Sequence, residues 1–112
     1  MAWLVHPVAT FISSDARLAT EARMLAQLQR LGIPAEQRQG NPSIVAEYVM
    51  VCLNLGLWRC FSDRLEFGLE EVEAHKTRVT INAVPSFSLG IDAAERKAEL
   101  SVLLTALQSS GS

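Results

Sequence analysis

Histidine offers the first test for metal or acid–base chemistry, because the chain contains only His6 and His75. Glu71 lies four residues before His75, so on a helix both side chains would share one face at the spacing of metal ligands. No third ligand stands at a fixed spacing from this pair. Exposed helices also carry such pairs for purely structural reasons. We therefore expect no metal site.

Cys52 and Cys60 are the two thiols of the chain. They fall in a segment interpreted below as one helix, where eight residues span ~12 Å along the axis. This distance exceeds the ~7 Å limit on the Cα separation of a disulfide. Arg59 would favour a thiolate at Cys60, but the C-terminal end of a helix disfavours one. We expect reduced, structural cysteines and a cytoplasmic protein.

Carboxylates concentrate in one stretch of eleven residues, whose acidic members are Asp63, Glu66, Glu70, Glu71 and Glu73. Paired carboxylates perform acid–base catalysis when one of them is desolvated. Here Lys76 and Arg78 follow directly, and the stretch is polar. We expect a solvated face, or an acidic docking surface for a basic partner, rather than a catalytic pair.

Glu47 and Asn54 are conspicuous because they interrupt an otherwise apolar run. They leave that run too short to span a membrane, which needs about 18–20 apolar residues. Seven residues apart, they would lie on one side of a helix. They form either a thin solvent-facing stripe or a specificity device in a helix–helix interface, where a buried amide fixes the register.

Motifs for cofactors or nucleophiles are absent from the sequence. There is no P-loop, no dinucleotide-binding glycine motif, no nucleophile elbow and no C-x-x-C pair. The net charge of -2, from ten basic and twelve acidic residues, provides no footprint for nucleic acid. We expect no catalytic residue, no cofactor and no direct nucleic-acid binding.

Two helices have clear boundaries in the sequence. Apolar residues at helical spacing predict a helix over residues 15–31, and Gly32 supplies a left-handed residue at its end. A second helix is expected over residues 92–107. Asp92 and Glu95 form a capping box at its start.

The apolar run of residues 44–61 favours a further, buried helix. Asn41 and Pro42 resemble a helix start, since one is a capping residue and the other suits the first helical position. A buried strand over residues 48–53 is the alternative, but it lacks flanking turn signals. We expect a helix over residues 42–60.

The remaining segments complete an α+β fold that is mainly helical. Alternating residues predict a strand over residues 78–84, whose partner is a hairpin arm at 65–72, the N-terminal segment or a second copy. Residues 65–72 also fit a helix, and the conformation of residues 1–12 stays open. Residues 1–108 are expected to form one domain, with a disordered tail over 109–112.

The excess of apolar residues points to association. The chain is 49% hydrophobic, and two amphipathic helices with one strand cannot easily cover a helix that is apolar on all sides. Large apolar patches are rare on soluble monomers, so we expect a homodimer or a protein partner. The residues expected in this interface are Val49, Leu53, Leu57, Trp58 and Phe61.

A small bacterial regulator that binds and occludes a protein such as a transcription factor would fit these features. The size and expected helix content resemble those of the small antiactivators of quorum-sensing regulators, which stand here as an example of the class. Most basic residues are arginine, which indicates a bacterium with a GC-rich genome. Residues 1–7 lack the basic leader of a signal peptide.

Two alternatives remain. An immunity or antitoxin protein would present the acidic stretch to a basic toxin surface, and salt would weaken that binding. A small α+β enzyme or ligand-binding domain would enclose an apolar pocket lined by Tyr48, Trp58 and Phe61.

Overall fold

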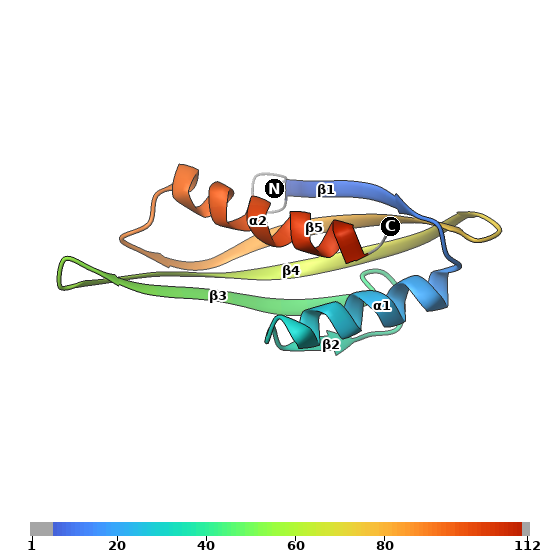
Figure 1. The fold of residues 1–112 in the computed structure, drawn as a ribbon, viewed down its shortest axis with the longest axis horizontal. Helices are drawn as coiled ribbons and strands as arrows, with labels where there is room; N and C mark the ends of the chain where they lie inside the picture. The colour runs from blue at the N-terminus through green and yellow to red at the C-terminus, as the bar shows by residue number, and fades with distance from the viewer. Residues whose placement is uncertain (1–5, 111–112) are drawn as a thin grey trace.

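A long antiparallel sheet dominates the protein, with two helices packed against it (Figure 1). The computed structural model describes the backbone of residues 6–110 and their side chains, apart from those of residues 6–8, 52, 54, 93, 109 and 110. The elements in chain order are β1 (His6–Ser13), α1 (Arg17–Arg30), β2 (Ala35–Gln37), β3 (Ile44–Asn54), β4 (Leu57–Glu73), β5 (Lys76–Leu89) and α2 (Ala93–Ser110). Strands account for about half of the chain and helices for about 30%.

The five strands form one sheet in the order β1-β5-β4-β3-β2 (Figure 1). β3, β4 and β5 follow one another in the chain and pair antiparallel, so they form a meander. β1 pairs with β5 at one border, and the short β2 pairs with residues 44–46 of β3 at the other. The centre of the sheet is therefore one continuous stretch of chain from residue 44 to residue 89.

The helix expected over residues 42–60 is wrong, because this segment forms β3, a tight turn and the start of β4. Asn54 lies opposite Leu57, and the hairpin closes around Leu55 and Gly56, which have φ angles of 54° and 78°. Such turns favour Asn or Asp followed by Gly, so a leucine concealed the turn. The two-residue alternation was also hidden, because both faces of this hairpin carry apolar side chains. The fold is thus sheet-rich and not mainly helical.

Asn41 and Pro42 do not begin a helix. They lie in the loop before β3 and are joined by a cis peptide bond. The segment 65–72, which fitted both a helix and a strand, is part of β4 and pairs with β5. Its partner strand includes residues 78–84, for example at Leu69 opposite Val79.

Two of the three expected helices are present, as α1 and α2. Gly32 follows α1 with a φ of 74°, which is the left-handed conformation expected at the end of this helix. At the start of α2 the Glu95 backbone N–H donates to the Asp92 carboxylate at 2.8 Å. α2 continues through Ser110, so residues 109 and 110 of the expected tail are helical, while 111 and 112 lie outside the described residues. Residues 6–12 of the open N-terminal segment belong to β1, and residues 1–5 also lie outside the described part.

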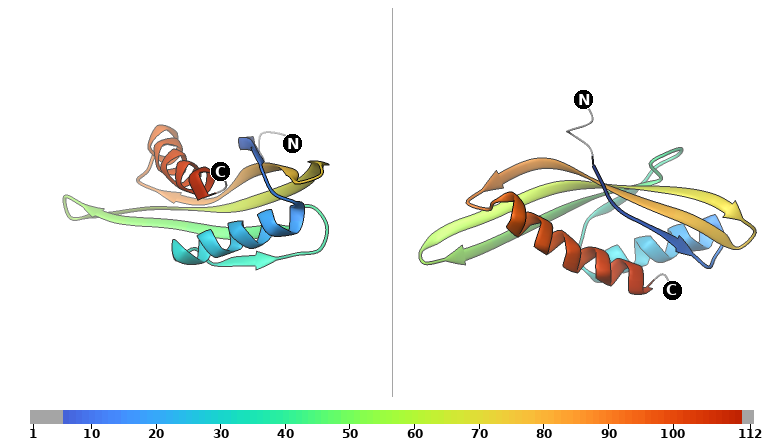
Figure 2. Two further views of the ribbon diagram at one scale, coloured as in Figure 1. Left: turned by 45° about the vertical axis from the view of Figure 1, so that its right-hand side comes forward. Right: turned by 90° about the horizontal axis from the view of Figure 1, so that it is seen from above.

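Both helices lie on the same side of the sheet (Figure 2). The core fills the space between them and consists of Met24, Leu28, Ile33, Ile44, Ala46, Phe61, Leu65, Phe67, Leu69, Val79, Ile81, Ala83, Ile91, Leu100, Leu103, Leu104 and Leu107. No described helix covers the opposite side of the sheet, which we call the open face. Neither of the described helices is long and apolar enough to span a membrane.

Candidate protein-interaction surface

Apolar side chains gather on the open face where β3, β4 and β5 run side by side. Residues directly opposed on neighbouring strands project from the same face of a sheet. Three rows of opposed residues make up this surface: Leu53 with Trp58; Val51 with Cys60 and Leu89; Val49 with Ser62 and Phe87. We call the large apolar members of these rows the hairpin patch: Val49, Val51, Leu53, Trp58, Phe87 and Leu89.

Every residue of the hairpin patch is more than half exposed, from 52% at Leu89 to 64% at Trp58. Aromatic side chains each present on the order of 150–250 Å², and valine and leucine present less, so at these exposures the patch exposes on the order of several hundred Å². The largest apolar patch on a typical monomer covers roughly 300–600 Å² and is commonly functional. The hairpin patch is therefore the strongest candidate for a functional surface on the described part of the chain.

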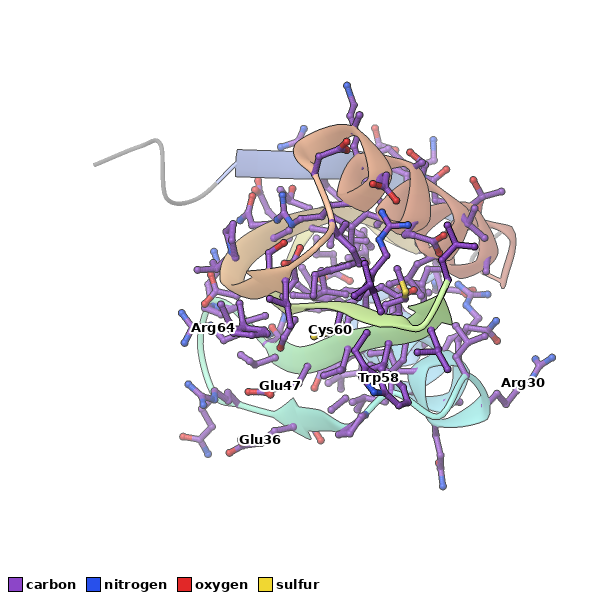
Figure 3. All side chains as sticks on the ribbon, turned by 90° about the vertical axis from the view of Figure 1, so that its left-hand side faces the viewer. Arg30, Glu36, Glu47, Trp58, Cys60 and Arg64 are labelled. Atoms are coloured by element: carbon purple, nitrogen blue, oxygen red, sulfur yellow. The ribbon has the colours of Figure 1, made fainter. Side chains whose placement is uncertain are left out.

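The fold leaves this surface uncovered for two reasons. Both helices lie on the other side of the sheet (Figure 2). In addition, the β3–β4 hairpin extends past the ends of both helices (Figure 1). Figure 3 looks at the molecule from this hairpin end, where Trp58 and Cys60 on β4 are labelled.

The open face changes character next to the hairpin patch. Glu47 lies opposite Arg64 in the row that follows Val49, and Figure 3 shows both on the same side of the sheet as Glu36 of β2. Arg64 forms an ion pair with Glu66 at 3.2 Å. Farther along, Arg78 faces Glu70 at 3.6 Å across β4 and β5. A paired, polar surface thus borders the apolar one.

The structure distributes the five expected interface residues over three environments. Val49, Leu53 and Trp58 belong to the hairpin patch. Leu57 is 69% exposed, but the alternation of side chains along β4 places it on the face opposite to Trp58. Phe61 is fully buried and contacts Tyr48 edge to face, with the ring centres 5.7 Å apart.

Val51, Phe87 and Leu89 complete the patch and were missed from the sequence. Phe87 and Leu89 alternate with Ser86 and Ser88, which is the signature of a strand with one apolar face. Pro85 stands directly before this pattern and obscures it, because proline donates no hydrogen bond to a sheet. The alternation was thus the available signal.

The residues weighed in the sequence for metal binding and for acid–base chemistry lie in separate parts of the sheet. Glu71 lies in a strand and His75 in a turn, so they do not share a helix face. Among the described residues, no group of three side chains could hold a metal ion. Asp63 is buried and accepts a hydrogen bond of 2.9 Å from Arg96 of α2.

The other carboxylates of the acidic stretch are paired as well, apart from Glu71. Glu66 and Glu70 have the arginine partners given above, and Glu73 lies 3.6 Å from Lys76. Glu47 is exposed, whereas the side chain of Asn54 lies outside the described part. Cys60 is a free, half-buried thiol, and the Cys52 side chain is also outside the described part.

Tyr48 is the one described titratable group with a shifted pKa. Burial raises the pKa of its phenol above 10.0, and the charge of Glu99 raises it further. Its side chain also borders a hollow of about 420 Å³ beside the outer edge of β3, lined by Leu31, Gly32, Ile33, Pro34, Glu47, Tyr48 and Val49. Trp58 and Phe61 point to opposite faces of β4, so the two do not line one pocket with Tyr48.

No model of a known protein family matches this sequence, and a comparison with curated proteins finds no match either.

Proposed function

We propose that the protein is a non-enzymatic binding module that docks another protein on its hairpin patch. The observation that carries this proposal is the gathering of six exposed apolar side chains from three strands on one uncovered sheet face. Removing such a surface from water is favourable by about 25 cal/mol per Å² of apolar area. A protein partner that covers the patch would gain this free energy.

The surroundings of the patch fit the anatomy of a protein interface. Such interfaces have an apolar centre and a polar, solvent-accessible rim. Here the row of Glu47 and Arg64 borders the apolar rows. Trp58 lies in the middle strand of the sheet, and tryptophan is among the residues that contribute most to binding energy. We therefore assign Trp58 the central role in docking.

A small bacterial regulator that occludes a transcription factor is one form of this proposal. The sheet-rich fold removes the helix content on which the resemblance to antiactivators rested, so the partner is proposed by its chemistry alone: a protein with a complementary apolar surface. A cytoplasmic location belongs to the proposal through the free thiol of Cys60.

The alternatives have less support. An immunity protein would need an open acidic surface, whereas Asp63 is buried against Arg96 and three of the glutamates face cations. An enzyme would need a titratable group in an enclosed pocket, and the hollow beside Tyr48 is an indentation of the sheet border.

Affinity capture from extract of the native cell tests the proposal. The tagged protein is compared with Trp58→Ser, with Leu53→Ser and with Val102→Ser, which removes an apolar side chain that is 70% exposed on α2, away from the patch. Proteins that bind the wild type and Val102→Ser, but neither patch variant, support the proposal. Equal capture by all four proteins would overturn it.

A further inference from the structure

The outer edge of β3 is unpaired over its second half. In its first half this edge is bonded to the segment that contains β2. The Arg38 N–H donates to the Ser43 carbonyl at 2.7 Å, and the Glu47 N–H donates to the Pro34 carbonyl at 3.0 Å, so Ser43 and Glu47 point their backbone groups outward. Along a strand, alternate residues point both backbone groups to the same side. The backbone groups of Val49, Val51 and Leu53 therefore point outward as well. Within the described residues, no backbone group pairs with them.

This edge lacks the features that protect sheet borders. Natural edge strands carry charged residues, proline or a bulge that prevent pairing with another chain. The other border strand, β1, has Pro7 and an irregular register between Pro7 and Ala9. In β3, residues 48–54 contain no charge and no proline, and the register with β4 is regular. An exposed edge of this kind is suited to pairing with another strand.

The edge is complementary to itself. Val49, Val51 and Leu53 present their backbone groups at equal spacing, with Val51 in the centre. Two copies related by a two-fold axis at Val51 would place Val51 opposite Val51, and Val49 opposite Leu53. Three N–H groups and three carbonyls from each copy would then form six hydrogen bonds. All residues opposed in this way are apolar, so no like charges meet.

The same register brings a second pair of features together. Leu55 at the hairpin turn is 94% exposed. In the Val51-centred register the turn of the other copy reaches the end of β2, where Pro34 already occupies the position opposite Glu47, so Leu55 lies against the hollow lined by Leu31, Ile33 and Pro34. The turn of each copy thus has an apolar indentation to contact. A symmetric pairing uses both open edges at once and leaves none for a third copy.

We infer that the protein forms a two-fold homodimer in which the β3 edges of two copies pair antiparallel about Val51 to give one ten-stranded sheet. The pairing sets the two hairpin patches side by side on the same face, as one larger docking surface for the partner. In this respect the inference deepens the proposed function and rests on it. The patch itself is not consumed, because Trp58 and Phe87 lie on strands away from the joined edges.

Sedimentation velocity of the full chain tests the pairing. Val51→Pro removes an outward N–H without touching a bond between β3 and β4, and proline is tolerated at such edge positions. We expect a dimer for the wild type and a dimer dissociation constant about 10- to 100-fold higher for Val51→Pro, since two hydrogen bonds at the axis are lost. Val51→Thr keeps the N–H and the β-branched shape, and should remain dimeric. Circular dichroism confirms that each variant is folded.

Cysteine crosslinking tests the register. In a background with Cys52→Ser and Cys60→Ser, oxidation with diamide should link two copies of Val51→Cys, because opposed Cα atoms in a hydrogen-bonded pair are ~5.5 Å apart. Leu53→Cys alone should not crosslink, since its counterpart lies four residues away along the strand, ~14 Å. The combination of Val49→Cys with Leu53→Cys should crosslink again.

A monomeric wild type, a Val51→Pro protein that dimerises as tightly as the wild type, or crosslinking of Leu53→Cys equal to that of Val51→Cys would overturn the inference. Dimerisation lost in Trp58→Ser but kept in Val51→Pro would instead indicate face-to-face packing of the patches. The outcome stays separate from that of the proposed function, because Trp58→Ser is expected to remain dimeric while losing partner capture. A monomer that still captures a partner through Trp58 would disprove only the edge pairing.

Discussion

Leu53 and Trp58 face each other across the β3–β4 hairpin, and both side chains are more than half exposed on the face of the sheet that no described helix covers. Only the turn of Leu55 and Gly56 and its flanking residues separate them in the sequence. The hairpin therefore creates the surface to which we assign function. On one helix, the same two residues would lie on different sides.

A substitution in the turn tests the hairpin, because it should change the free energy of unfolding in opposite directions for a hairpin and for a helix. Gly56 has a φ of 78°, and a Cβ at this position would meet no atom within 4 Å. In the hairpin, Gly56→Ala should lower the free energy of unfolding by about 1 kcal/mol through the left-handed backbone alone. In a helix, the same change would raise it by about 1 kcal/mol. Urea unfolding measures the difference, and a stabilised Gly56→Ala protein would contradict the hairpin.

Leu55 occupies the first position of the turn at a φ of 54°. Leu55→Asn should stabilise the protein by up to about 1 kcal/mol, because asparagine tolerates this conformation and Asn-Gly is a favoured sequence for such turns. Leu55→Val is the matched control, since a β-branched residue is strained at positive φ and should destabilise the protein. Thermal unfolding of the three proteins should rank them Asn, Leu, Val. The reverse order would count against the turn.

The buried ion pair between Asp63 and Arg96 fixes α2 to the middle of β4. Asp63 is only 1% exposed, so Arg96→Met should leave a buried carboxylate without its partner and lower the free energy of unfolding by about 3–5 kcal/mol. Lys76→Met, which removes the partner of an exposed carboxylate, should change it by less than about 1 kcal/mol.

A second substitution separates this loss of charge pairing from a loss of packing. Asp63→Asn in the Arg96→Met background removes the unpaired charge and should recover a large part of the stability. A double variant as unstable as Arg96→Met alone would show that the arginine acts through its packing. Denaturant unfolding of the wild type, Arg96→Met, Asp63→Asn and the double variant gives the coupling free energy of the pair.

The raised pKa of Tyr48 makes stability depend on pH in the alkaline range. The phenol ionises near 10.0 in the unfolded chain and at higher pH in the folded protein. Above pH 10 the unfolded state has therefore released more protons than the folded state, and the free energy of unfolding falls as the pH rises. Tyr48→Phe should lack this component. Between pH 8.5 and 11 the free energy of unfolding of the wild type should therefore fall relative to that of Tyr48→Phe, and a constant difference between the two proteins would contradict the shift.

Local signals predicted the parts of the fold that depend on neighbouring residues. Gly32 marked the end of α1, and Asp92 with Glu95 marked the start of α2. The alternation over residues 78–84 predicted a strand that forms part of β5. Each of these features involves residues within a few positions of one another, so the sequence contains the information.

The centre of the sheet was misread for a physical reason that also concerns function. Residues 44–61 are apolar on both faces, because Ile44, Ala46 and Phe61 face the core while Val49, Val51 and Leu53 form the hairpin patch. A strand with one solvated polar face would have shown alternation, and the patch removed it. Leu55 in a conformation that usually requires Asn or Gly then concealed the turn.

The candidate site was accordingly predicted only in part. Val49, Leu53 and Trp58 came from the apolar run itself, whereas Phe87 and Leu89 join them through the pairing of β5 with β4, more than twenty residues away in the chain. Phe61 was included because helix spacing puts it beside Trp58, while the strand period puts it on the other face. An apolar run can be divided into core and surface residues only when it is known whether side-chain direction repeats every 3.6 residues, as in a helix, or every two, as in a strand.

The affinity of a captured partner for Trp58→Ser, relative to Val102→Ser, tests the account most directly. Both changes replace an exposed apolar side chain with serine, at 64% and 70% exposure respectively, so neither should disturb the core. Isothermal titration calorimetry should show at least about tenfold weaker binding for Trp58→Ser and an unchanged dissociation constant for Val102→Ser. Equal affinities of the two variants, both folded, would contradict the assignment of the hairpin patch as the docking surface.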